Sequence, residues 1–156
     1  MTKTRVELAT DFVQDVLARE GAAWVRAASS SMAPLIQPGD ELRLAPFAAA
    51  RVHAGAIVAF RRGGELVVHR VLRRAPGGVV TRGDALGEAD SPMVWSRVIG
   101  RIVAIRTPSG RLLDLDRWPW PLIGRALAAV ARLGAPDRLA WIARRAPFHL
   151  AALVSR

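Results

Sequence analysis

The pattern of apolar and polar positions divides the chain into three parts. Near the N-terminus the apolar residues recur at helical spacing, at Val6, Ala9, Val13, Val16 and Leu17. This spacing predicts a helix over residues 5–20 with one buried face. A capping-box pattern from Thr4 to Glu7 marks the start of this helix, and Gly21 is a suitable residue to follow its end.

Between Ala22 and about Asp114, short apolar runs alternate with turn signals. The segments Arg61–Gly64 and Pro76–Gly78 are typical of hairpin loops. Strands this short, with no helices between them, indicate an antiparallel sheet or a small barrel. The fold class is therefore expected to be mainly β. The expected strands are 22–28, 41–45, 56–60, 65–72, 79–82, 97–106 and 111–115.

From Trp118 onward the spacing is again helical. Pro121 suits the first position of a helix over residues 121–133. Two further short helices are expected, at 137–145 and 148–154. The chain thus divides into an N-terminal helix (1–21), a β domain (22–116) and a basic helical tail (117–156).

The net charge of the chain limits the kinds of partner that it is expected to bind. The formal net charge is +10 at pH 7, which attracts anionic surfaces. Residues 117–156 hold seven arginines, three tryptophans and a single carboxylate, Asp137. Two interpretations of this tail stay open. Residues 118–156 lie peripherally on an anionic membrane, or their helices pack on the sheet with the arginines in solvent.

Several classes of protein are excluded by what the sequence lacks. There is no cysteine, so a disulfide scaffold and a thiolate metal site are excluded. No apolar stretch reaches the ~18 residues expected of a membrane-spanning helix. Charged residues from Asp11 to Glu20 interrupt any signal-peptide core. We therefore expect the chain in the cytoplasm or peripherally at the inner membrane face.

The candidate chemistry lies in three consecutive serines at residues 29–31. A catalytic serine needs a base beside it. The only lysine is Lys3, near the N-terminus, and among the three histidines His69 lies within an expected strand that can hold a base rigidly. The hypothesis is a hydrolase with Ser31 as nucleophile and His69 as base.

Six short motifs follow one another between residues 24 and 105. They are Ser31–Pro34, Pro38–Leu42, Gly55–Phe60, Val68–Val71, Thr81–Asp84 and Val98–Ile102. Each motif alone is weak, but in this order they resemble the S24/S26 peptidase superfamily, which includes type I signal peptidases and self-cleaving repressors of the SOS type. His69 stands where most bacterial members carry lysine, so the chain is similar to the Ser-His signal peptidases of archaea and the endoplasmic reticulum.

The resemblance implies a β-ribbon fold, a coiled antiparallel sheet with the serine at its edge. It also implies a substrate that adds as an extended strand. Ser31 would be the nucleophile and His69 the general base and then the acid, since histidine is largely neutral at pH 7. A carboxylate should orient the imidazole. Asp84 is the first choice for this role and Asp90 the second, although a turn role is an alternative for each.

The remaining expectations concern the oxyanion and the substrate. The backbone N–H of Ser31 and the hydroxyl of Ser29 are the expected oxyanion donors, with Met32 and Pro34 expected to contact the substrate. For Ser29, a simple turn hydroxyl is the alternative. No cofactor and no metal site are expected.

The chain departs from the family pattern at three places. Ala56 stands where an acid is often found, and Ala85 stands where asparagine often follows Gly-Asp. No segment of the printed sequence resembles the N-terminal transmembrane anchor of the family, so we expect a restricted substrate or attachment through the tail.

The function expected from the sequence is a serine endopeptidase acting on an export-type or precursor polypeptide. One alternative is a self-processing, DNA-associated module resembling the SOS-type repressors. The other is a non-catalytic protein that binds peptides. Nucleic acid is not the expected partner, because the sequence shows no convincing helix-turn-helix.

Overall fold

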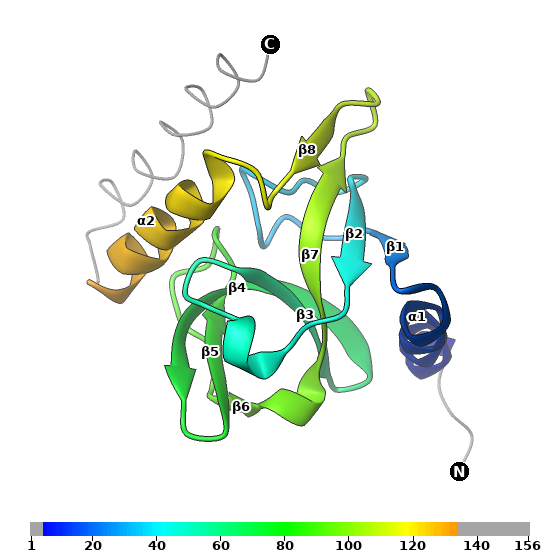
Figure 1. The fold of residues 1–156 in the computed structure, drawn as a ribbon, viewed down its shortest axis with the longest axis horizontal. Coiled ribbons are helices and arrows are strands. Elements are labelled where there is room, and N and C mark those ends of the chain that lie inside the picture. Colours follow the sequence, from blue (N-terminus) through cyan, green and yellow to red (C-terminus); the bar gives the residue numbers. More distant parts are fainter. Residues whose placement is uncertain (1–4, 134–156) are drawn as a thin grey trace.

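The short apolar runs in the middle of the chain form one eight-stranded sheet in which every pair of neighbours is antiparallel (Figure 1). The structure is a computed structural model that describes residues 5–133, with side chains from residue 9 onward. The strands are β1 (Ala23–Arg26), β2 (Glu41–Ala45), β3 (Ile57–Arg62), β4 (Glu65–Ala75), β5 (Gly78–Arg82), β6 (Met93–Val94), β7 (Val98–Arg106) and β8 (Leu112–Asp114). The mainly β fold expected from the sequence is confirmed.

The sheet is organised around β7. The strand order of the sheet is β1-β2-β7-β3-β4-β5-β6, and β8 pairs with the C-terminal end of β7. Arg101 in β7 is paired with both Ala45 of β2 and Val58 of β3, so two strands flank this strand at one point. Register shifts in the β2–β7, β3–β7 and β4–β5 pairs bend the sheet, because a bulge increases the local twist.

Two helices flank the sheet at well-separated places (Figure 1). Helix α1 (Arg5–Glu20) lies beside β1, and Gly21 follows it with a φ of 71°, as a C-terminal glycine should. Helix α2 (Trp120–Arg132) packs near β4. It begins one residue earlier than expected, so Pro121 is its second residue. Two short 3₁₀ turns, Ala49–Arg51 and Trp95–Arg97, connect strands.

The expected helices at 137–145 and 148–154 and the cap at Thr4 lie outside the described residues. The part of the chain described here contains no helix that is both long enough and apolar enough to cross a membrane.

One strand was absent from the sequence prediction. β6 has only two residues, and it pairs with the start of β5 through Gly78↔Val94 and Val79↔Met93. A Cβ on Gly78 would lie 1.9 Å from the carbonyl oxygen of Met93, so only glycine fits there. A strand of two residues beside a turn signal has no readable alternation, which is why the pattern gave no sign of it.

The larger core cluster holds the segment that follows the serines. Met32, Leu35 and Ile36 are buried in it, together with Leu42 of β2 and Ile102 of β7. These side chains therefore fix the segment to the strands beneath it. A second cluster fills the space around Val58, Phe60 and Val71.

Candidate active site

The turn that carries Ser31 is held by backbone hydrogen bonds and by the buried side chains of neighbouring residues. The N–H of Ala33 donates to the carbonyl of Ser30 at 2.9 Å, and the N–H of Ile36 donates to that of Met32 at 3.1 Å. The Met32 and Ile36 side chains are buried in the core, whereas Ser31 is half-buried and so accessible. The turn thus presents a hydroxyl from a fixed backbone.

The loop after β5 braces the same turn. The N–H of Ala85 donates to the carbonyl of Ser31 at 2.9 Å. This approach depends on Gly83, because a Cβ at that position would lie 2.6 Å from the Ser31 oxygen. The glycine of the Gly-Asp motif therefore lets the loop lie against the serine.

His69 comes from β4 and is buried, with 1% of its surface exposed. Its Nδ1 lies 2.6 Å from Oδ2 of Asp90. An ionised carboxylate only accepts hydrogen bonds, so Nδ1 carries a proton and, in the neutral ring, Nε2 has the lone pair. The ring also packs edge-on against Phe60, with the centroids 5.8 Å apart. The imidazole is thus fixed in the tautomer that a base needs.

Asp90 is itself fixed by two further donors. The Thr81 hydroxyl donates to Oδ2 at 2.7 Å, and Nη1 of Arg62 donates to Oδ1 at 2.9 Å. The N–H of Asp90 also donates to the Thr81 carbonyl at 2.8 Å. The carboxylate therefore keeps a single orientation toward the imidazole, and it also forms an ion pair with Arg62.

Asp84, the first choice from the sequence, does not take this role in the structure. Its Oδ1 accepts from Nε of Arg70 at 2.8 Å and its Oδ2 accepts from Nη2 of Arg70 at 2.6 Å. Both side chains are buried. The carboxylate that contacts His69 is the second choice, Asp90, because both oxygens of Asp84 accept hydrogen bonds from the Arg70 guanidinium. This corrects the expected order.

Ser31 and His69 line the same groove, which has a volume of about 450 Å³. The Ser29 hydroxyl also lies in it, with its Oγ 3.2 Å from Oγ of Ser31. Within residues 5–133, no acceptor takes the N–H of Ser31. The groove is otherwise largely apolar, with charged residues at its rim. The other lining residues include Val25, Met32, Leu66, Val68 and Leu86, with Arg26, Arg62 and Glu65 among the charged ones.

Met32 and Pro34 lie in different places. Met32 lines the groove, although most of its side chain is in the core. Pro34 is not among the groove residues, and its carbonyl accepts a hydrogen bond from Gln37 Nε2 at 3.2 Å. The expected contact between Pro34 and substrate therefore finds no support in the lining of this groove.

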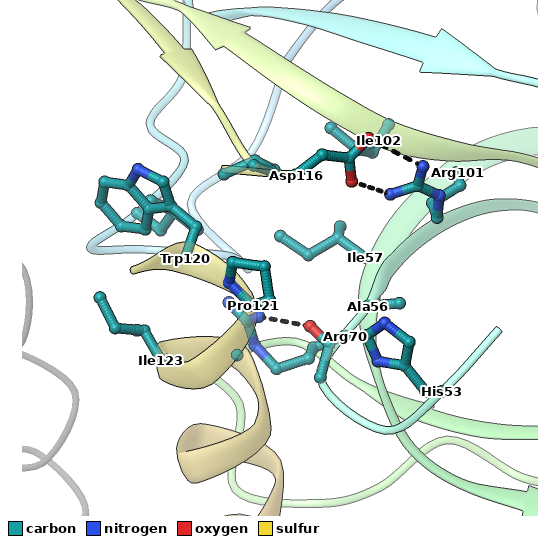
Figure 2. A pocket seen from close by; sticks show the side chains of 14 residues that line it. His53, Ala56, Ile57, Arg70, Arg101, Ile102, Asp116, Trp120, Pro121 and Ile123 are labelled. Atoms are coloured by element: carbon teal, nitrogen blue, oxygen red, sulfur yellow. Dashed lines mark hydrogen bonds and ion pairs between the residues drawn. The ribbon is translucent and has the colours of Figure 1, made fainter. Parts of the chain in front are cut away.

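A second pocket lies on the other side of β4, under α2 (Figure 2). Figure 2 shows Arg70 reaching the carbonyl of Gly55, at 2.8 Å, and Arg101 paired with Asp116. The hydrogen bonds from Arg101 to Asp116 raise the pKa of the guanidinium above its ordinary value. The cavity is only about 50 Å³, room for water-sized molecules. It is therefore a small packing gap beside α2.

Three residues of this arrangement were not assigned a role from the sequence. Thr81 and Arg62 hold Asp90, and Arg70 holds Asp84. A weak signal existed for two of them. Thr81 follows the apolar pair Val79–Val80, and Arg70 lies between Val68 and Val71, so each is a polar residue within an expected buried strand. Buried polar groups in such positions need partners.

The histidine and the two aspartates do not form a metal site in the part of the chain that is described. No group of three histidine, cysteine, aspartate or glutamate side chains there is placed to hold an ion. Asp84 is engaged with Arg70, so His69, Asp84 and Asp90 do not converge on one point.

Comparison with known proteins identifies the family. The model of the Peptidase S24-like family matches residues 2–81, which include both Ser31 and His69 and end before Asp84 and Asp90. A comparison with curated proteins gave no match. The family match covers just over half of the 156 residues, and it agrees with the fold and with the groove that Ser31 and His69 share. The chain belongs to the Peptidase S24-like family.

Proposed function

We propose that this chain is a serine endopeptidase in which Ser31 is the nucleophile, His69 the general base and Asp90 the orienting carboxylate. The observation that supports it most is the hydrogen bond between Asp90 and Nδ1 of His69 on the wall of the groove that Ser31 also lines. That bond leaves Nε2 as the nitrogen able to accept a proton. A base that is oriented by a third group and shares a groove with a serine hydroxyl provides the three groups that nucleophilic catalysis requires.

The reaction runs in two halves. Ser31 Oγ attacks the scissile carbonyl while its proton passes to Nε2 of His69, and the imidazolium then gives that proton to the leaving amine. Water next attacks the acyl-serine, with His69 taking the water proton and returning it to Ser31. Asp90 stays ionised throughout and stabilises the imidazolium.

Two donors would stabilise the oxyanion formed in each half. The Ser31 N–H has no acceptor among the described residues, and the Ser29 hydroxyl lies 3.2 Å from the Ser31 oxygen. Losing one such donor typically costs about 3 kcal/mol of transition-state stabilisation. Ser29→Ala should therefore slow cleavage without abolishing it.

The substrate is a polypeptide bound in extended form along the groove. The apolar lining, from Val25 to Leu86, suits apolar side chains on alternate residues of such a strand. We further propose that the substrate is an export-type or precursor polypeptide, as in a signal-peptidase-like enzyme. Family membership equally admits cleavage of the chain itself, as in the SOS-type repressors.

The test uses two pairs of matched variants. Ser31→Ala is compared with Ser30→Ala, the adjacent exposed hydroxyl, and His69→Ala with His53→Ala, an exposed histidine in a loop. Each protein is incubated with a peptide library from a digested proteome, and new termini are identified by mass spectrometry. Labelling with a fluorophosphonate and the intact mass of each chain are measured alongside.

We expect cleavage to be lost in Ser31→Ala and His69→Ala and retained in both controls. Cleavage of the chain itself, seen by intact mass at a rate independent of concentration, would favour the self-processing alternative. If Ser31→Ala cleaves like the wild type, the proposal is wrong. If the wild type binds peptides without cleaving any, the chain is a peptide-binding protein.

A further inference from the structure

Helix α2 presents apolar side chains on the side turned away from the sheet. Leu122 is 57% exposed and Leu133, just after the last turn, is 83% exposed, while Trp118 before the first turn is 68% exposed. Ala126 is exposed between the two leucines. At about 3.6 residues per turn, Leu122, Ala126 and Leu133 fall on one stripe.

The opposite side of the same helix is the one that packs. Gly124, Leu127 and Ala128 are its buried residues. A Cβ on Gly124 would lie 2.6 Å from the carbonyl oxygen of Gly55, so the helix backbone is in close contact with the loop before β3. The helix is therefore fixed by one face, and the apolar stripe is not needed for its docking.

Positive charge accompanies the stripe. Arg125 and Arg132 are exposed and flank it at helical spacing, and Arg117 is exposed just before Trp118. No carboxylate among residues 5–133 pairs with these three arginines. The sequence of residues 117–133 contains no acidic residue, and residues 134–156 add four arginines against one aspartate.

We propose that this outer face of α2, formed by Trp118, Leu122, Arg125, Arg132 and Leu133, binds the surface of an anionic phospholipid bilayer. Apolar side chains with a tryptophan enter the interface, and arginines beside them contact the headgroups. Charge complementarity selects this occupant over a second copy of the chain, because two copies of the same face would bring their arginines together.

The groove lies on the other side of β4 from this face. His69 lines the groove, whereas its neighbour Arg70 lies beside Gly124 of α2, and adjacent residues of a strand point to opposite faces. When α2 binds the bilayer, the groove therefore stays free to receive a polypeptide. The inference does not depend on catalysis, since the membrane-binding face can be tested in a chain with Ser31→Ala.

The experiment measures flotation of the full-length chain with vesicles. One set contains equal parts of phosphatidylglycerol and phosphatidylcholine, and the other contains phosphatidylcholine alone. We expect flotation with the anionic vesicles only, and it should weaken as salt is raised. Trp118→Ser combined with Leu122→Gln should weaken the partition about tenfold or more, and Arg125→Glu combined with Arg132→Glu should do the same.

The matched controls are on other elements. Phe12→Ser removes an aromatic ring from α1 that is 68% exposed, as Trp118 is, and Arg43→Glu with Arg97→Glu reverses two exposed arginines away from α2. Both should float like the wild type. Circular dichroism and the unfolding midpoint confirm that every variant is folded.

Three outcomes would overturn the proposal. One is the absence of flotation with anionic vesicles. Another is flotation of the α2 variants equal to that of the wild type, which would assign any lipid binding to another part of the chain. The third is a dimer, measured by light scattering, that Trp118→Ser with Leu122→Gln dissociates while flotation is unchanged, which would assign the face to a second copy.

Discussion

Strand β4 carries two buried basic side chains next to each other, and each is paired with its own aspartate. His69 pairs with Asp90 on the side of the groove, and Arg70 pairs with Asp84 on the side of α2. Both aspartates belong to the segment that follows β5. The two pairs are thus built from the same strand and the same loop, but they face opposite ways.

The difference between the pairs lies in what the base can do. The Arg70 guanidinium is a donor only and stays protonated, so its pair with Asp84 can hold structure but cannot transfer a proton. Three of its contacts, two to Asp84 and one to the Gly55 carbonyl, fasten the loop after β5 to the one before β3. In His69, by contrast, Nδ1 contacts Asp90 and the other ring nitrogen, Nε2, is left to accept a proton. A basic side chain paired with an aspartate therefore stabilises position on one side of β4 and supports chemistry on the other.

The largest expected effect is on the catalytic pair. Asp90→Asn should lower kcat by about 10³–10⁴-fold, because an amide can hold the imidazole in the wrong tautomer. The free energy of unfolding should change little by comparison. Cleavage of the best peptide from the library measures the rate, and urea unfolding measures the stability. A rate within a few-fold of the wild type would show that Asp90 does not orient the base.

The structural pair should respond in the opposite way. Arg70→Met leaves Asp84 buried without its partner and should lower the free energy of unfolding by about 3–5 kcal/mol. Adding Asp84→Leu should recover much of this loss, since no charge is then left unpaired. Arg73→Met, at an exposed position of β4, is the matched control and should be nearly neutral. A double variant no more stable than Arg70→Met alone would contradict the argument.

A smaller effect is expected at the contact between Gly83, in the loop after β5, and the carbonyl of Ser31. Gly83→Ala places a methyl group against the Ser31 carbonyl and should cost about 1–3 kcal/mol, with a loss of activity beyond that of the fraction unfolded. Gly87→Ala in the same loop meets nothing within 4 Å and is the control. Equal behaviour of the two variants in urea unfolding and peptide cleavage would show that the contact does not position Ser31.

The smallest effect concerns the hydroxyl behind Asp90. Thr81→Val keeps the shape of the side chain and removes its hydrogen bond to Oδ2, which should cost about 1 kcal/mol, or roughly fivefold in rate. Thr81→Ser restores a hydroxyl and should recover part of the rate. Peptide cleavage by the two variants, compared at equal folded fraction, checks this. A rate for Thr81→Val equal to that of the wild type would remove Thr81 from the network.

The sequence predicted the sheet and the two described helices because their patterns are local. Alternation and turn signals placed β2 at 41–45 as observed, and the 3.6-residue spacing placed α1 at 5–20. The ends of strands were less accurate. β4 continues to Ala75, past the expected end at Leu72, because polar Arg73 and Arg74 gave no apolar signal although their backbones pair with β5.

The two aspartates show where sequence reasoning stopped. Asp84 and Asp90 both follow a strand in a segment without periodicity, so nothing in the pattern says which side of β4 each will face. The preference for Asp84 came from its motif. Its position is instead decided by the buried guanidinium of Arg70. The place of Arg70 within an expected buried strand indicated that its side chain needs a partner, but not which aspartate supplies it. A pairing across the sheet is a tertiary fact that spacing alone does not contain.

The loop between the two aspartates has a practical consequence. Residues 85–89 are exposed, Gly87 has open space around it, and Leu86 lies at the edge of the groove. Each aspartate is fastened to its own side of β4, so neither of these contacts depends on the length of the chain between them. Exposed loop tips of this kind accept insertions. Peptides grafted between Gly87 and Glu88 would alter which sequences enter the groove while the contacts of Asp84 with Arg70 and of Asp90 with His69 persist, so this site can be used to redesign specificity.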